Sequence, residues 1–231
     1  MKTELKFDSA VNVPAELLVV LAADASTSND ANAASQPVLL TKNSAFEQAV
    51  QNVLTTGEFR ASAWETLLLH APGGLQAKRL LVIGLGKQSK ISLQAVRKAA
   101  GTAVRFAKSR GLRQITLALP DLASVPQDGA ARAAVEGAFV GDFDPDVYRS
   151  DRKDRTMEQF TVVAAGASGN KAVEGAFREG VVLGESQNFA RSLVNEPGNV
   201  LTPTVLGQRA AAMCKEQGLA CEVHSTNKLK E

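Results

Sequence analysis

Residues 79–84 have the sequence RLLVIG, which is the most strand-like segment of this 231-residue chain. A short, continuous run of branched apolar side chains is typical of a strand that is buried on both faces of a sheet. Residues 16–23, ELLVVLAA, have the same character and predict a second buried strand. Because strands of this kind need helices on both sides of the sheet, the two segments favour an α/β fold.

Helices and further strands alternate outward from these two segments. Ser44 and Glu47 have the spacing of a capping box, which predicts a helix that ends at Gly57. Ser92 is predicted to cap a second helix, which has an apolar stripe at helical spacing and ends at Gly111. The remaining predictions are strands at residues 2–7, 64–70, 113–119, 159–165 and 219–224, a helix at 127–140 and a loop at 24–37. This βαβα order predicts a mostly parallel sheet with helices on both faces.

A long helix is predicted over residues 170–195. At about 1.5 Å per residue it would be close to 40 Å long, which favours a connection between two domains. Pro197 ends it, and Thr202 followed by Pro203 begins another helix. The last 35 or so residues then supply one helix and one strand, too little to bury a core. We therefore expect the chain to end inside a second domain.

The composition is that of a soluble globular protein, with 45% hydrophobic and 22% charged residues. A net charge of +2 gives no excess of basic residues for nucleic-acid binding. Two cysteines and the absence of a signal-peptide pattern indicate a reducing, cytoplasmic location. The longest apolar run, residues 17–23, is too short to span a membrane.

Residues 84–87, Gly-Leu-Gly-Lys, follow a strand and precede a helix. Ser89 stands where a dinucleotide-binding fingerprint requires a third glycine. Two interpretations remain open: an anion-binding turn at a helix start, or, more simply, a tight connection in which glycine permits a positive φ.

Asp142, Asp144 and Asp146 have the spacing of a calcium loop. Val147 and Lys153 occupy the positions that require Gly and Glu, so the simpler interpretation is a solvated charged connector that continues through residues 148–155.

Two further patterns could bear catalysis or a metal. The sequence around Ser168 matches the nucleophile-elbow motif except at one position, and Ser168 is more simply interpreted as a helix cap. Nucleophilic catalysis also needs a histidine base, which could come only from His70 or His224. Cys214, Cys221 and His224 lack the fourth ligand of a zinc site and are interpreted as core or surface residues. Arg178, Glu179, Glu185 and Arg191 on the long helix are interpreted as a solvated face or as interdomain ion pairs.

Four segments in this order resemble the N-terminal part of the leucine (cytosol) aminopeptidase family: residues 64–88, 93–105, 136–151 and 188–204. The resemblance implies a macro-like N-terminal domain (1–168), a connecting helix (169–196) and the truncated start of a C-terminal peptidase domain (197–231). It also implies a homohexamer in which the C-terminal domain, with two divalent metals (zinc or manganese), removes N-terminal residues such as leucine from peptides.

The family's catalytic motifs, Asp-Ser-Gly-Gly or Asp-Thr-Gly-Gly and Asn-Thr-Asp-Ala-Glu-Gly-Arg, are absent from this sequence and would follow Glu231. We therefore assign no catalytic, cofactor-binding or metal residue here, and we expect this chain alone to be inactive. The positions that match the family, with a structural role at the helix exit, are Asn188, Arg191, Asn195, Pro197, Asn199, Thr202 and Pro203. Ser192 stands where the family usually has Asp, which implies the loss of one polar contact.

Two alternatives remain. One is a stand-alone macro-like module that binds ADP-ribose or another nucleotide at residues 84–87. The other is nucleic-acid binding through Arg149, Arg152, Lys153 and Arg155, whose positive charge is diluted by Asp151 and Asp154.

Overall fold

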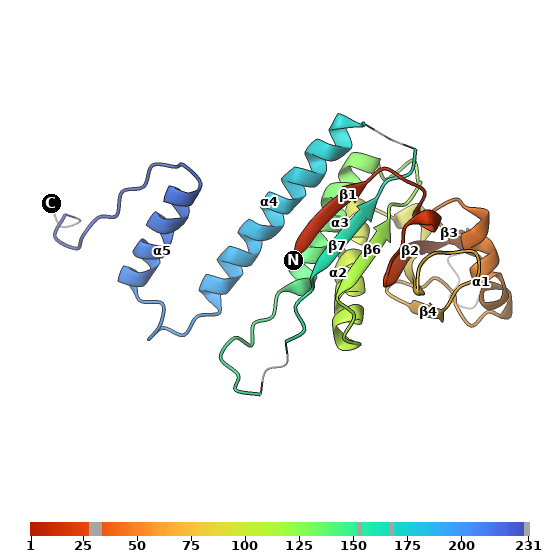
Figure 1. Cartoon of the computed structure of the whole chain (residues 1–231), viewed down its shortest axis with the longest axis horizontal. Coiled ribbons are helices and arrows are strands. Elements are labelled where there is room, and N and C mark those ends of the chain that lie inside the picture. Colours follow the sequence, from red (N-terminus) through yellow and green to blue (C-terminus); the bar gives the residue numbers. More distant parts are fainter. Residues whose placement is uncertain (28–33, 152–153, 167–168, 229–231) are drawn as a thin grey trace. The chain divides into compact units, whose positions relative to one another are not determined.

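The computed structural model describes residues 1–27, 34–151, 154–166 and 169–228 (Figure 1). The chain divides into two compact units, Met1–Ser186 and Gln187–Glu231. No helix within the described ranges is long and apolar enough to cross a membrane.

The first unit is built on a seven-stranded sheet in the order β1-β7-β6-β2-β5-β4, with β3 paired to β2. The strands are β1 Lys2–Lys6, β2 Leu17–Asp24, β3 Pro37–Leu39, β4 Thr66–His70, β5 Arg79–Lys87, β6 Gln114–Ala118 and β7 Gln159–Val163. Strands β1, β7, β6, β2 and β5 are parallel to their neighbours, whereas β4 and β3 pair antiparallel with β5 and β2. The predicted mostly parallel sheet is therefore confirmed.

The helices are α1 Ser44–Thr56, α2 Leu93–Ser109, α3 Gln127–Asp142, α4 Lys171–Val194 and α5 Pro203–Glu216, with short 3-10 turns η1 Ala10–Asn12 and η2 Gln88–Lys90. Gly57 ends α1 with a φ of 75°, as predicted. The predicted cap at Ser44 is wrong by one residue, because the side chain of Asn43 accepts the hydrogen bond from the Ala45 N–H at 2.9 Å. Ser92 does precede α2, but its side chain makes no capping hydrogen bond.

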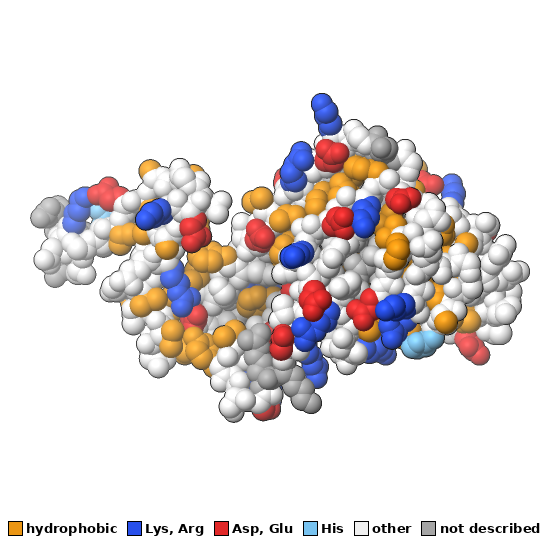
Figure 2. Space-filling model, viewed as in Figure 1, with side chains coloured by type: hydrophobic (Ala, Val, Ile, Leu, Met, Phe, Trp, Pro, Cys, Tyr) orange, Lys and Arg blue, Asp and Glu red, His pale blue; other side chains and the backbone are white. Residues whose placement is uncertain are grey.

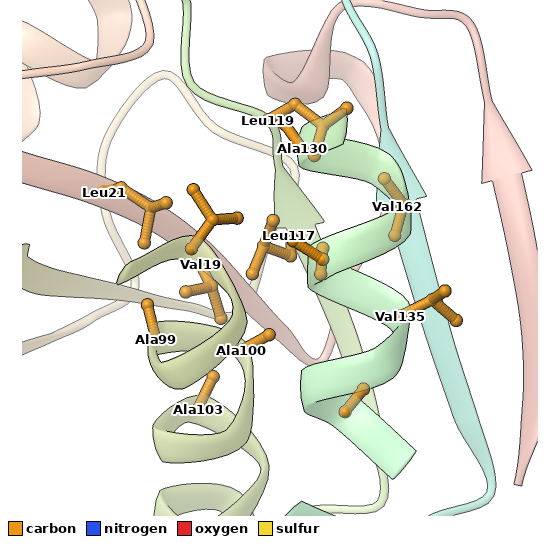
Figure 3. Close-up of a cluster of buried hydrophobic side chains, with 14 of the residues drawn as sticks. Val19, Leu21, Ala99, Ala100, Ala103, Leu117, Leu119, Ala130, Val135 and Val162 are labelled. Atoms are coloured by element: carbon orange, nitrogen blue, oxygen red, sulfur yellow. The ribbon is translucent and has the colours of Figure 1, made fainter. Parts of the chain in front are cut away.

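Helices cover both faces of the sheet, as predicted. Alternate residues of β2 point to opposite faces, so that Val19 packs in one hydrophobic cluster and Val20 in the other. The first cluster joins β2 and the strands beside it to α2 and α3 (Figure 3). The second joins the opposite face to α1 through Phe46 and Val50.

The part of α4 in the first unit packs closely on α3 through two glycines. A Cβ atom added at Gly180 would lie 2.4 Å from Val135, and one added at Gly184 would lie 2.7 Å from Phe139. Contacts this short require glycine at both positions, since only its missing side chain lets the two helices approach so closely.

Two sequence-based predictions of local structure are wrong. Pro37, the last residue of the predicted loop, begins β3, because residues 22–24 of β2 extend past the residues that pair with β6 and can pair on that side. Residues 219–224 were predicted to form a strand but are irregular. A strand must share its N–H and C=O groups with a neighbour, and no described strand pairs with this segment.

Candidate functional site

The carboxyl ends of the parallel strands are the usual ligand-binding edge of an open α/β sheet. Residues 84–87 do lie at this edge, but as the last part of β5 rather than as a turn into a helix. The connection to α2 comes afterwards, through η2 and residues 91–92. The prediction of a strand-to-helix turn at residues 84–87 is therefore wrong.

The two glycines of this segment serve a close backbone approach. A Cβ atom at Gly84 would lie 2.3 Å from the Ser62 carbonyl oxygen. Gly86 has a φ of 81°, and its N–H donates to the Ala61 carbonyl at 2.9 Å. These contacts let residues 61–65 run against β5, which explains the glycines without a bound phosphate.

Lys87 is a charged residue at this edge, and its ammonium group is paired. It lies 2.8 Å from a carboxylate oxygen of Asp24, at the end of β2, and donates to the Ser26 hydroxyl at 2.6 Å. A cavity of about 300 Å³ opens here, lined by residues 24–27 and 87–89. An anionic ligand would have to compete with Asp24 for Lys87, so the electrostatics do not favour a phosphate site.

Asp24 is held as a carboxylate. Partial burial acts to raise its pKa, but hydrogen bonds from Lys87, from the Gln36 N–H and from Ser26 outweigh that effect. The net result is a pKa well below the ordinary range of an aspartate. The pair therefore joins the carboxyl ends of β2 and β5 as a structural ion pair.

Replacement of Asp24 by asparagine should flatten the acid dependence of stability. A carboxyl whose pKa is lower in the folded state stabilises the fold above its unfolded pKa of about 3.9, and this contribution is lost as the pH falls below that value. We expect Asp24→Asn to cost about 1–2 kcal/mol at pH 7 and progressively less toward pH 2. Urea unfolding at several pH values measures this; a constant difference between variant and wild type across that range would contradict it.

Asp142 and Asp144 do not form a calcium loop. The ammonium group of Lys108 donates to Asp142 Oδ1 at 3.1 Å and to Asp144 Oδ2 at 2.7 Å, and its side chain is only 5% exposed. Arg105 adds a second contact to Asp144 at 3.2 Å. The interpretation of these two aspartates as a solvated connector is therefore wrong. Sequence reasoning missed Lys108, although its position four residues after the buried Val104 places it near the apolar face of α2.

Cys214, Cys221 and His224 do not fit a metal site. Cys214 lies in α5, whereas Cys221 and His224 lie in the irregular segment that follows. Burial and the neighbouring Cys221 thiol raise the pKa of Cys214, which disfavours the thiolate that a metal requires. Within the described residues, no group of three or more His, Cys, Asp or Glu side chains is placed to hold a metal ion.

Some of the other candidate residues can be located in the structure, and the rest lie outside the described ranges. Ser168, Arg152 and Lys153 are outside them. The first turn of α4 is capped by Asn170, whose side chain accepts from the Ala172 N–H at 3.1 Å. Arg149 forms two hydrogen bonds with Asp151, at 2.9 and 2.8 Å, so much of its charge is already compensated.

The long helix carries an ion pair, but not of the predicted interdomain kind. Glu179 lies 3.3 Å from Arg132 of α3, so this pair joins two helices of the first unit. Arg191 donates to the Asn188 side chain at 3.4 Å, within the second unit.

The second unit shows how the chain turns between α4 and α5. The Asn195 side chain donates to the Arg191 carbonyl at 2.7 Å, and Thr202 caps α5 by accepting from the Val205 N–H at 3.3 Å. Glu196 pairs with Arg209 at 3.0 Å. Pro197 follows the last turn of α4, and Pro203 is the first residue of α5. The Ser192 hydroxyl donates to the Phe189 carbonyl at 2.7 Å.

This fold defines the class: a mostly parallel α/β domain that continues into a long helix. Residues 19–152 match the family described as "Cytosol aminopeptidase family, N-terminal domain", and the chain belongs to that family.

Two curated relatives show which part of such a protein this chain represents. It is 48% identical to a probable cytosol aminopeptidase of Acidobacterium capsulatum and 36% identical to one of Koribacter versatilis. Both matches cover all of this chain but only 46% and 47% of the relatives. The chain thus spans about half the length of these proteins and corresponds to their N-terminal part.

Solved structures show the same fold. A tomato leucine aminopeptidase variant superposes with a TM-score of 0.70 at 22% identity, covering 94% of this chain and 42% of the tomato chain. The bottromycin maturation enzyme BotP in complex with Mn gives 0.67 at 24% identity, covering 93% and 39%. Neither match supports the alternative of a stand-alone nucleotide-binding module.

Proposed function

We propose that this chain is the non-catalytic N-terminal region of a metal-dependent aminopeptidase. The full-length enzyme would remove N-terminal residues, such as leucine, from peptides. The observation that carries the proposal is the coverage: relatives match the whole chain, yet half of each relative has no counterpart in it.

The chemistry of the described residues supports placing the metals in the downstream half of the protein. Two-metal hydrolysis needs several carboxylates around a pair of cations. Here Asp24, Asp142 and Asp144 are already neutralised by lysines. In the part of the chain that the structure describes, these three carboxylates therefore do not fit the two metals, zinc or manganese, that the family resemblance implies, and we assign both metals to the downstream half.

We assign residues 1–168 to a macro-like domain, 169–196 to the connecting helix and 197–231 to the start of the peptidase domain. The bounds of α4, Lys171–Val194, support the middle segment. We further propose that the full-length protein is a cytoplasmic homohexamer whose N-terminal domains serve assembly or access to the active site. We propose no nucleic-acid partner; Figure 2 shows charges of both signs interspersed on the face in view, which supports this.

A peptidase assay on two polypeptides tests the proposal. With manganese added, we expect hydrolysis of leucine amide by a polypeptide that includes the downstream half and none by the 231-residue chain. Hydrolysis by the 231-residue chain would overturn its non-catalytic role. An inactive longer polypeptide, correctly folded and loaded with manganese or zinc, would overturn the aminopeptidase assignment.

A further inference from the structure

Among the described loop residues of the first unit, the large apolar side chains between α3 and β7 are the most exposed. Val147 and Tyr148 are 62% and 60% exposed. In Figure 1 the segment that follows α3 extends beyond the end of β7. Adjacent exposed Val and Tyr side chains at a projecting tip are unusual in a free surface, and Tyr is a frequent anchor of protein interfaces.

The base of this segment is held firmly on the incoming side. Lys108 contacts Asp142 and Asp144, and Arg105 contacts Asp144 and the Phe143 carbonyl. These contacts fix the chain where it leaves α3. Because the charges are already paired within the unit, they contribute to the position of the tip rather than to a ligand.

The outgoing side is tied to the same anchor. The Met157 N–H donates to Asp142 Oδ1 at 3.2 Å, and the Met157 side chain is buried. Asp154 lies 3.4 Å from Arg113. The chain is therefore held in place both where it leaves α3 and where it approaches β7. The part of the segment that carries Val147 and Tyr148, called the tip, projects from this base.

The tip itself has the local order of a binding element. The Arg149 N–H donates to the Asp146 carbonyl at 3.1 Å, which closes a turn around Val147 and Tyr148. Arg149 and Asp151 then pair beside the turn. An apolar centre with a charged rim, already ordered, is the arrangement that lets an interface form without a large loss of conformational entropy.

The direction of the strands shows that the chain leaves the first unit at the edge that carries the tip. Helices that follow parallel strands run back to the edge where the strands begin, so α3 ends at that edge and the 143–151 segment projects from it. Within the first unit, α4 follows β7 and runs to the same edge before the chain leaves the unit after Ser186. The first unit therefore ends, at Ser186, at the edge from which the tip projects.

We infer that the segment 143–151 is a docking element, and that Val147 and Tyr148 pack against the protein's own downstream half, beyond residue 231. This inference rests on the proposed function, because it takes the downstream half to exist as it does in the relatives, which are about twice as long. Lys108 and Asp142 are positioning residues for the tip.

Hydrogen–deuterium exchange on the 231-residue chain and on the longer polypeptide tests this inference directly. We expect the amides of residues 146–149 to exchange about tenfold more slowly, or slower still, in the longer polypeptide. Equal exchange in the two would overturn the inference. Protection that rises with concentration in the 231-residue chain would also overturn it, since a second copy would then be the partner.

A pair of variants gives a second, independent readout. Val147→Ser with Tyr148→Ser should lower the melting temperature of the longer polypeptide by clearly more than that of the 231-residue chain. The matched control is Val38→Ser on β3, a half-exposed apolar residue at the carboxyl edge of the sheet, which should have the same effect in both polypeptides. Equal shifts for the double variant in both polypeptides would count against docking.

The docking inference and the proposed peptidase activity can each fail without the other. If the longer polypeptide hydrolyses leucine amide while residues 146–149 stay unprotected, the docking inference fails and the proposed function stands. If those residues are protected but no peptide bond is cleaved, the docking element stands and the proposed activity fails.

Discussion

Replacement of Gly137 by alanine should destabilise the first unit by about 2–3 kcal/mol, although alanine is the better helix former. The two helices α2 and α3 approach so closely that a Cβ atom at this position would lie 1.9 Å from the Arg97 carbonyl oxygen. The atom it meets is backbone, so a side-chain rotation cannot relieve the overlap and the helices must separate. We expect the melting temperature to fall by about 5–10 °C.

The matched control is Gly175→Ala in α4. Nothing lies within 4 Å of a Cβ atom at that position. The same substitution there should therefore stabilise the protein by about 0.5–1 kcal/mol, through the helix propensity of alanine alone. Thermal unfolding of both variants decides the question, and a neutral Gly137→Ala would show that the two helices are not in close backbone contact.

Replacement of Lys108 by methionine should cost about 3–5 kcal/mol. Its ammonium group contacts both Asp142 and Asp144, and the Lys108 side chain is almost fully buried. Methionine has a similar length but no charge, so the buried carboxylate of Asp142 loses its cation. Asp144 keeps Arg105 as a partner. Chemical denaturation at pH 7 measures the loss.

Two further variants separate the charge effect from a packing effect. Lys42→Met removes an exposed lysine whose partner, Asp121, lies 3.6 Å away, and it should change stability by less than about 0.5 kcal/mol. Lys108→Met combined with Asp142→Asn should recover part of the loss, since the uncompensated charge is then gone. If the double variant is as unstable as the sum of the two single variants, the buried ion pair is not the cause.

Local patterns in the sequence were sufficient to predict most of the helices and strands. The apolar run at residues 16–23 became β2, and the helical stripe after Ser92 became α2. The predicted helix over 170–195 agrees with α4 to within one residue at each end. These elements could be predicted because their apolar periodicity and their stop signals are properties of neighbouring residues.

Apart from the cap of α1, which is Asn43 rather than Ser44, the errors depended on contacts between residues that are distant in sequence. Gly84 and Gly86 suggested a turn, whereas residues 61–65 lie against them and keep them within β5. Asp142 and Asp144 suggested a solvated loop, yet they are neutralised by a lysine more than 30 residues earlier. The predicted strand at 219–224 has the composition of a strand but no partner among the described residues.

The sequence alone thus determined the fold class, the order of the elements and the resemblance to cytosol aminopeptidases, because apolar periodicity, caps and family motifs are written in adjacent residues. Only the tertiary structure decided that Lys87 and Lys108 are ion-paired, that glycines pack α2, α3 and α4 together, and that Val147 and Tyr148 project into solvent. Charge compensation, close packing and exposure depend on which distant residues share space, and that is settled only when the chain folds.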